Sequence, residues 1–317
     1  MDTVTERMND SLTFDRPFPH LTPAQRYHLD VYGYVIVENT LKPAEVSHIK
    51  DELYWLRDEL QQLDDSSASG PRVRDAFIAI DKPYHHYMAN IIEAAPVITA
   101  YATLPFMVSM AEELIGGEVR IVEMNAHINR RDADRRCDEP PMYGFHRGTD
   151  IPFASHTHHG LFHCNFVKTL TNLTDLGPDD GGTVVIAGSH KIDVSTKELV
   201  ELAYEDHRLI HQVVAPAGST LLFSEALIHA TGQHRSDKER VIIITGYGST
   251  LFPYWDNSRE HSQLSKSFRR QIPQQLKVLF EGKASHTRGP RYRTLSMPAD
   301  TRQFDLGEWN QRPPAAD

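Results

Sequence analysis

The chain has 317 residues, with 33 lysines and arginines against 43 aspartates and glutamates, 40% hydrophobic residues and two cysteines. This composition is that of a globular protein, and it excludes a fibre, a disulfide scaffold or a disordered tail. The net charge of −10 argues against general nucleic-acid binding, which needs a cationic surface to displace counterions.

Membrane insertion and secretion are not expected from this sequence. No segment approaches the roughly 18 uninterrupted apolar residues of a membrane span, and the N-terminal segment is polar and acidic where a signal peptide would be basic and then apolar. Cys137 and Cys164 fit a reducing compartment, and neither has a second cysteine at metal-ligand spacing. We therefore expect a cytoplasmic protein.

The first third of the chain predicts helices with one strand between them. Thr22-Pro23 and Gly33 have the residue types that begin and end a short helix, and the strand YVIV follows. From Pro43 an apolar stripe at steps of three and four predicts an amphipathic helix, formed by Val46, Ile49, Leu53, Leu56, Leu60 and Leu63. Residues 64–72 have a loop composition, and residues from about 85 to 115 predict further helix that ends at Gly116-Gly117.

After residue 118 the chain changes to short apolar runs of β type, separated by glycine- and proline-containing turns. Helices followed by many short strands indicate an α+β fold around an antiparallel sandwich or barrel. We expect one domain over 1–317: helices and a first strand in 1–118, the β core with the functional site in 119–250, and a C-terminal extension in 251–317 that is basic over 259–293.

Histidine is the unusual residue of this sequence, with 18 in the chain. Five of them fall within one short stretch of the β region: His146, His156, His158, His159 and His163. Neutral imidazole is the commonest metal ligand in proteins, so this density favours a metal site, although a single histidine is more often an ordinary surface or hydrogen-bonded residue.

The segments GFHRGTD, TNLTDLGPDDGGTVVIAGSHK and APAGSTLLFSEALIHATGQHRSDKER together resemble the phytanoyl-CoA dioxygenase family of iron(II)/2-oxoglutarate oxygenases. The resemblance covers about residues 30 to 250. It implies a double-stranded β-helix, the jelly-roll barrel of cupin type, and an oxidoreductase that functionalises an unactivated C–H bond of a small molecule. The implied cofactors are Fe(II), 2-oxoglutarate and O₂.

The resemblance also implies roles for individual residues. His146 and His229 correspond to the two metal-binding histidines, and Arg240 corresponds to the arginine that holds the far carboxylate of 2-oxoglutarate. A guanidinium group matches a carboxylate bidentately, which suits Arg240 to this role. Asn125 and His127 alternate on one predicted strand and are further candidates for 2-oxoglutarate contacts.

Gly148 departs from the family pattern, because the common metal motif has a carboxylate two residues after the first histidine. Glycine at this position resembles the radical halogenases, in which chloride binds the metal where the carboxylate is missing. Three other interpretations remain open: Asp150 reaches the metal through a bulged strand, water fills the position and the enzyme hydroxylates, or the protein is a cupin-like binding shell without catalysis.

His156 and His158 offer a different enzyme, because alternate residues of a strand point the same way and two imidazoles can share a zinc ion. Under the family resemblance these two histidines, with Thr149 and Asp150, lie instead in a segment that contacts substrate or covers the site. Glu225 is a candidate to hold a metal-bound imidazole from outside the ligand set. The basic segment 259–293 favours an anionic substrate if it crosses the barrel mouth.

Overall fold

The computed structural model describes residues 21–63, 73–135, 141–148, 155–158, 160–249, 264–273 and 276–281. Within these ranges no helix is both long enough and apolar enough to cross a membrane. The predicted loop at 64–72 lies outside the described residues.

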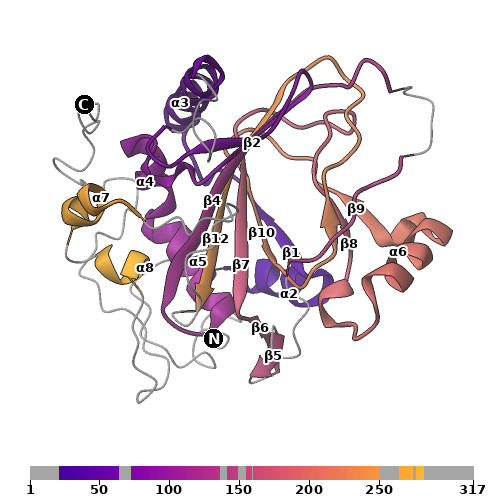
Figure 1. Ribbon diagram of the computed structural model, residues 1–317. Helices are drawn as coiled ribbons and strands as arrows, with labels where there is room; N and C mark the ends of the chain where they lie inside the picture. The colour runs from indigo at the N-terminus through magenta and orange to yellow at the C-terminus, as the bar shows by residue number, and fades with distance from the viewer. Residues whose placement is uncertain are drawn as a thin grey trace.

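Two antiparallel sheets face each other and form the centre of the molecule (Figure 1). The main sheet has the order β1 (Tyr34–Val37), β10 (Thr220–Ser224), β7 (Phe166–Asn172), β12 (Arg240–Ser249), β4 (Val119–Asn129), β3 (His85–Ala89) and β2 (Phe77–Lys82). The second sheet has the order β11 (His229–Ala230), β8 (Val184–Ile186) and β9 (Ile210–Gln212). This arrangement is the expected jelly roll.

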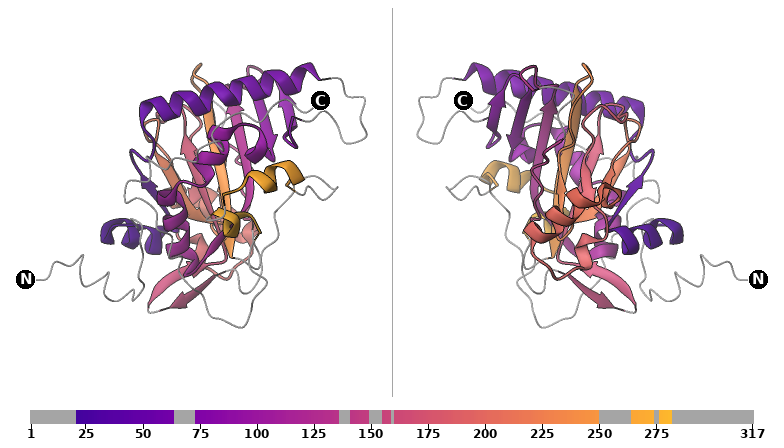
Figure 2. Two further views of the ribbon diagram at one scale, coloured as in Figure 1. Left: turned by 90° about the vertical axis from the view of Figure 1, so that its left-hand side faces the viewer. Right: turned by 90° about the vertical axis from the view of Figure 1, so that its right-hand side faces the viewer.

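Helices cover the outer face of the main sheet (Figure 1). They are α3 (Pro43–Gln62), α4 (Pro96–Ala102), α5 (Pro105–Ile115), α7 (Lys266–Gln271) and α8 (Lys277–Glu281), with the 3-10 turn η1 (Ile91–Glu93) before α4. The long helix α3 runs across the strands of the sheet (Figure 2). The large apolar core lies between these helices and the sheet, which is why α3 buries the predicted stripe from Val46 to Leu60.

The remaining elements surround the second sheet and one end of the barrel. Helix α2 (Pro23–Tyr32) precedes β1, and α6 (Thr196–Glu205) packs beside β8 with the 3-10 turns η2 (Ser189–Lys191) and η3 (His207–Leu209). A separate hairpin is formed by β5 (Ser155–His158) and β6 (Leu161–Cys164). The predicted caps of α2 are confirmed: Thr22 accepts a hydrogen bond from the Gln25 N–H, and Gly33 ends the helix at φ +86°.

The expectation of continuous helix from residue 85 to 115 is wrong in its first part. Residues 85–89 form β3, which pairs with β4, and the unpredicted β2 extends the sheet beyond it. Backbone pairing with β4 and burial of Met88 and Ala89 outweigh the local helical appearance. Helices α4 and α5 follow, and α5 ends at Gly116 as predicted, while Leu63 caps α3 and is exposed.

The main sheet turns a partly polar face toward the second sheet. Ile242 and Ile244 of β12 belong to the core between the sheets, and they pair with His127 and Asn125 of β4. Paired residues of antiparallel strands share a face, so His127 and Asn125 also face the barrel interior. Arg240 lies two residues before Ile242 on β12 and points the same way.

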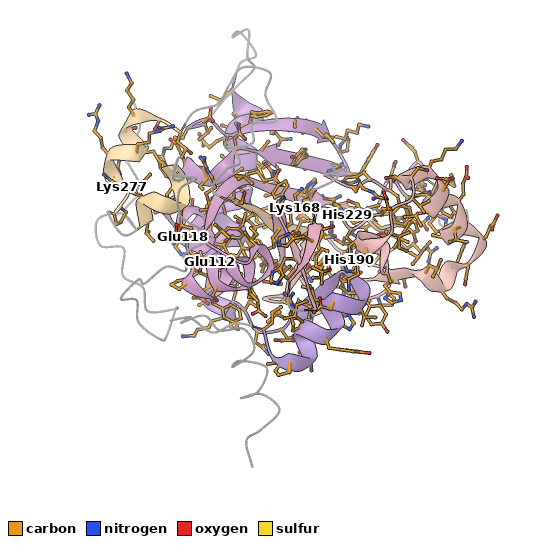
Figure 3. All side chains as sticks on the ribbon, turned by 90° about the horizontal axis from the view of Figure 1, so that it is seen from below. Glu112, Glu118, Lys168, His190, His229 and Lys277 are labelled. Carbon is orange, nitrogen blue, oxygen red and sulfur yellow. The ribbon has the colours of Figure 1, made fainter. Side chains whose placement is uncertain are left out.

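The described part of the basic segment lies outside the barrel. Helix α8 packs against β4, and the Arg120 guanidinium donates to the carbonyl oxygen of Phe280 at 3.0 Å. Lys277 and His229 lie on opposite sides of the main sheet (Figure 3). Residues 264–273 and 276–281 therefore do not cross the barrel mouth, while the rest of segment 259–293 lies outside the described residues.

The glycine-rich turn before β8 ties two loops together at the barrel rim. A Cβ atom at Gly182 would lie 2.0 Å from the carbonyl oxygen of Val213, so only glycine permits this approach. The Asp180 carboxylate accepts hydrogen bonds from the Gly177 N–H at 2.8 Å, the Ser236 hydroxyl at 2.5 Å and the Lys238 ammonium at 3.0 Å. This aspartate holds the loop before β12 against the turn.

Replacing Asp180 by asparagine should destabilise the protein by about 1–3 kcal/mol at neutral pH. Burial alone would raise the pKa of Asp180, but the hydrogen bonds from Ser236, Gly177 and Lys238 outweigh it and lower the pKa from 3.8 to about 2. The stabilisation is therefore complete above about pH 4 and is lost as the pH falls toward 2. Urea denaturation should show the difference in unfolding free energy between wild type and Asp180→Asn narrowing as the pH falls from about 4 toward about 2.

Asp179→Asn is the matched control, because the Asp179 side chain is exposed and its Arg235 partner is 3.9 Å away. Equal unfolding midpoints for wild type and Asp180→Asn at neutral pH would contradict this role of Asp180.

Candidate metal centre

His146 and His229 lie side by side, as the family resemblance predicts. Their backbones form an antiparallel bridge, with the His146 N–H donating to the His229 carbonyl at 3.0 Å and the reverse bond at 2.9 Å. Their ring centroids are 4.4 Å apart. His229 also pairs with Val185 of β8, which belongs to the core between the sheets, so the buried His229 imidazole faces the barrel interior. The His146 side chain lies against it and is exposed.

Hydrogen bonds leave the same nitrogen of each imidazole available to a metal. His229 Nδ1 lies 2.9 Å from the carbonyl oxygen of Leu227, and His146 Nδ1 lies 3.0 Å from that of Gly144. A carbonyl can only accept, so each Nδ1 carries the proton and each Nε2 presents a lone pair. Burial, with His146 and Lys168 nearby, lowers the pKa of His229 to about 3, which keeps this imidazole neutral.

The space beside Gly148 is filled by Glu225. The Gly148 N–H donates to the carbonyl oxygen of Glu225 at 3.0 Å, which brings the two backbones together. A Cβ atom built on Gly148 would lie 1.5 Å from Glu225 Oε2. The Glu225 side chain is only 1% exposed, and its Oε1 lies 4.0 Å from His229 Nε2. The carboxylate thus stands beside the paired histidines.

A buried charge network continues from Glu225 into the barrel. The Lys168 ammonium lies 3.2 Å from Glu225 Oε1 and 3.0 Å from Glu123 Oε1, and the Asn125 amide donates to Glu123 Oε2 at 3.1 Å. Burial would lower the pKa of Lys168, but the two carboxylates outweigh it and raise the pKa. Figure 3 shows Lys168 and His229 next to each other in the interior. The lysine remains charged and faces two carboxylates.

The side chains of His146, His229 and Glu225 lie close together but do not form a complete set of metal ligands. Among the described residues, no group of three His, Cys, Asp or Glu side chains has the spacing of a ready metal site. Two ligands at right angles on one ion, each at roughly 2.1 Å, are about 3 Å apart, so the 4.0 Å between Glu225 and His229 is about 1 Å too long. Small side-chain rotations would close this difference.

Arg240 is a fully buried cation, and no anionic partner for it lies among the described residues. Its side chain is 1% exposed, and Nη2 donates to the Thr183 hydroxyl at 3.1 Å. Nε and Nη1 have no hydrogen-bond partner in the described chain, and burial lowers the pKa of Arg240 to about 10. Thr183 lies two residues, about 7 Å along the strand, before Val185, the partner of His229, so the segment that holds the guanidinium leads directly to the candidate metal-binding histidine.

Of the predicted 2-oxoglutarate contacts, His127 lies nearer to Arg240 than Asn125 does. Arg240 pairs with Asn129 on β4, two residues from His127, whereas Asn125 belongs to the Glu123 network. His127 stacks on Tyr87 with 4.4 Å between ring centroids, and its Nδ1 lies 2.9 Å from His85 Nε2. Burial and the neighbouring charges lower the pKa of both histidines, that of His85 to about 4.

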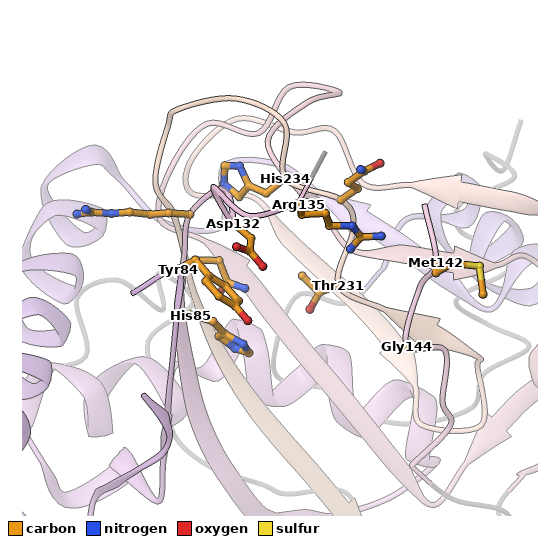
Figure 4. Close-up of a pocket in the computed structure, with 12 residues that line it drawn as sticks. Tyr84, His85, Asp132, Arg135, Met142, Gly144, Thr231 and His234 are labelled. Atoms are coloured by element: carbon orange, nitrogen blue, oxygen red, sulfur yellow. The ribbon is translucent and has the colours of Figure 1, made fainter. Parts of the chain in front are cut away.

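A pocket of about 300 Å³ opens beside these residues (Figure 4). His85 and Asn129 line it on the β3 and β4 side, and Gly144 and Thr231, each two residues from a candidate metal-binding histidine, line it on the other side. Further polar lining comes from Tyr84, Arg130, Asp132, Arg135, Gln233 and His234. The pocket is thus polar and lies near the paired histidines in the chain, although His146, His229 and Arg240 are not among its lining residues.

The hairpin histidines lie elsewhere. His156 is exposed on β5 and stacks on His163 of β6 at 5.5 Å between centroids, and His163 Nδ1 lies 3.2 Å from the Leu114 carbonyl oxygen. His158 pairs with Leu161 through the backbone. Thr149 and Asp150 lie outside the described residues, so no position is assigned to a carboxylate from Asp150.

Comparison with known proteins identifies a family model and several solved structures that are similar to this chain. The family model described as "Phytanoyl-CoA dioxygenase (PhyH)" matches residues 29–242. HygX from Streptomyces hygroscopicus, solved with nickel and 2-oxoglutarate bound, is 22% identical with a TM-score of 0.59 over 75% of this chain and 91% of that one. EctD from S. alaskensis, solved with 2-oxoglutarate and 5-hydroxyectoine, is 18% identical with a TM-score of 0.56 over 78% and 84%.

AviO1 from Streptomyces viridochromogenes Tue57 is 16% identical, with a TM-score of 0.53 over 76% of this chain and 98% of that one. No curated protein matches the chain by sequence. The structural likenesses confirm the jelly-roll fold, and the family match covers both metal-candidate histidines and Arg240. The chain therefore belongs to the phytanoyl-CoA dioxygenase family of non-haem iron(II)/2-oxoglutarate oxygenases.

Proposed function

We propose that this protein uses Fe(II), 2-oxoglutarate and O₂ to oxidise a C–H bond of a polar small molecule. The observation that carries the proposal is Arg240, a buried guanidinium with two N–H groups that lack partners in the described chain. An unpaired buried charge is costly, and a carboxylate ligand would satisfy it with bidentate hydrogen bonds. The far carboxylate of 2-oxoglutarate has the required charge and shape.

The residues on the opposite side of this space fit the metal. His146 and His229 each place Nδ1 against a backbone carbonyl, so Nε2 is the nitrogen that would bind the metal, and imidazole nitrogen is a ligand that suits Fe(II). In this class of enzyme the bound iron supplies the redox chemistry that couples decarboxylation of 2-oxoglutarate to succinate with oxygen insertion into substrate. The protein binds and orients the reactants, and the apolar core between the sheets excludes water from them.

The pocket of Figure 4 is the proposed substrate entrance. Its lining carries side chains of both charges, including Arg135 and Asp132, so a polar substrate fits better than an apolar one. Two of the similar structures hold such molecules: HygX has been solved with hygromycin B, and EctD with 5-hydroxyectoine. The described basic helices α7 and α8 pack on the outer face of the main sheet, so their charge gives no support for an anionic substrate.

Chlorination is the second candidate, and Gly148 is the observation that favours it. A glycine supplies no ligand, so an anion such as chloride can bind the metal where a carboxylate from residue 148 would exclude it. The two reactions share the histidines, Arg240 and the pocket, and they differ only in what occupies the position beside Gly148.

Arg240→Gln should weaken 2-oxoglutarate binding by between about 30-fold and a few thousand-fold, because loss of a buried charge-assisted pair costs about 2–5 kcal/mol. The folded protein should not be destabilised, since the substitution removes a buried charge that has no ion pair. Calorimetric titration of the metal-loaded protein with 2-oxoglutarate measures the effect. Arg131→Gln, at an exposed position paired with Asp237, is the control. Equal affinities for Arg240→Gln and wild type would refute the assignment.

His229→Ala should lower Fe(II) affinity by more than about 100-fold, because a direct ligand contributes more than the 10- to 100-fold typical of groups behind a ligand. Anaerobic equilibrium dialysis against Fe(II) measures this. His156→Ala is the control and should bind as wild type does. If metal binding were lost in His156→Ala and kept in His229→Ala, the result would favour a zinc site on the hairpin. If the wild-type protein bound no metal, the result would favour a non-catalytic binding shell.

A further inference from the structure

We propose that Glu225 is the third protein ligand of the metal, and that it replaces the carboxylate that residue 148 lacks. This inference rests on the proposed function and assigns the ligand set of the same site. Glu225 reaches the position from the turn between β10 and β11, not from the strand of His146. The glycine at 148 then marks a carboxylate that comes from another segment and not an open coordination position.

The close approach of the two backbones carries the proposal. The Gly148 N–H bonds to the Glu225 carbonyl, and a Cβ at residue 148 would lie 1.5 Å from Glu225 Oε2. Any side chain at 148 would therefore have to displace the Glu225 carboxylate. Conversely, the carboxylate occupies the volume where an aspartate at 148 would begin. A side chain at 148 and the Glu225 carboxylate in its present position therefore exclude each other.

Position and charge both suit Glu225 to a metal shared with His229. Its Oε1 lies 4.0 Å from His229 Nε2 and 3.2 Å from the Lys168 ammonium. A glutamate side chain has three rotatable bonds, so a shift of about 1 Å brings the oxygen to the roughly 3 Å separation of neighbouring ligands.

The surrounding charges also favour a cation at this place. Glu123 and Glu225 are both buried and face one ammonium group, that of Lys168, so the network carries one more negative than positive charge when both are ionised. Burial of an uncompensated negative charge is unfavourable, and a divalent cation beside Glu225 would offset it. Lys168 also restrains the Glu225 carboxylate through the 3.2 Å ion pair with Oε1, which makes it a positioning residue.

The consequence for the reaction is that oxygen insertion, and not chlorination, fits the site. A carboxylate beside Gly148 repels a halide and takes the coordination position that chloride would need. The glycine at position 148 then resembles the halogenase motif only because the carboxylate ligand, Glu225, comes from a different part of the chain.

Cobalt(II) is the probe, because its visible absorption reports the number and type of ligands without turnover. In wild type loaded with Co(II) and 2-oxoglutarate, the spectrum should not change with chloride. Glu225→Ala should bind Co(II) more than about 100-fold more weakly, and its spectrum should shift saturably with chloride. Glu123→Gln removes the other carboxylate from Lys168 and should change Co(II) affinity by less than about tenfold.

A rescue variant protects the test against simple misfolding. Gly148→Asp in wild type would collide with Glu225, but in the Glu225→Ala background the space is free. The double variant should therefore recover most of the lost Co(II) affinity and lose the chloride response. A chloride-sensitive wild-type spectrum, or equal losses of affinity in Glu225→Ala and Glu123→Gln, would overturn the inference while leaving the proposed function intact. Failure of wild type to bind Co(II) and 2-oxoglutarate would overturn both.

Discussion

The interior between the two sheets holds a buried cation, Arg240, at one place and a buried network with more acidic than basic groups at another. The proposed chemistry depends on this distribution of charge. Arg240 is a buried cation with no anion beside it in the part of the chain that the structure describes, while Glu123 and Glu225 share one lysine. Each excess is unfavourable in a low-dielectric interior unless a ligand of opposite charge binds beside it. A dicarboxylate that contacts Arg240 at one end and a metal ion at the other would satisfy both ends at once.

The jelly roll makes this arrangement possible because it places strand ends from distant parts of the chain around one interior. Arg240 begins β12 on the main sheet, yet its guanidinium reaches Thr183 beside the second sheet. The backbone of His229 pairs with His146 on one side and with Val185 of β8 on the other. These pairings fix the position of its imidazole relative to the segment that contains Thr183. The backbone pairing that builds the fold therefore also sets the spacing of the groups that would bind the cofactors.

Much of this could be predicted from the sequence, because the motifs carry local information. The caps of α2, the stripe of α3, the antiparallel core and the positions of His146, His229 and Arg240 depend on patterns or on family resemblance. Strand β3 was not predicted, since its identity depends on pairing with β4, 30 or more residues away in the chain. Lys168 was missed as well, because an isolated lysine in an apolar strand shows no partner until the register is known.

Glu225 shows most clearly what spacing alone does not reveal. From the sequence it is an acid four residues before a histidine, and Gly148 is a missing ligand. Only the contact between these two segments shows that the absent side chain and the buried carboxylate share one volume. A motif with one ligand missing therefore has to be judged together with the segments that pack against it.

The most direct test of the account is an anaerobic optical titration of the metal-free protein with Fe(II), then 2-oxoglutarate and then chloride. Chelation of 2-oxoglutarate to ferrous iron produces a visible charge-transfer band. The account predicts that this band appears with 2-oxoglutarate and is unaffected by chloride. No band would contradict assignment of the site to iron and 2-oxoglutarate, and a band that shifts saturably with chloride would contradict a carboxylate at the position beside Gly148.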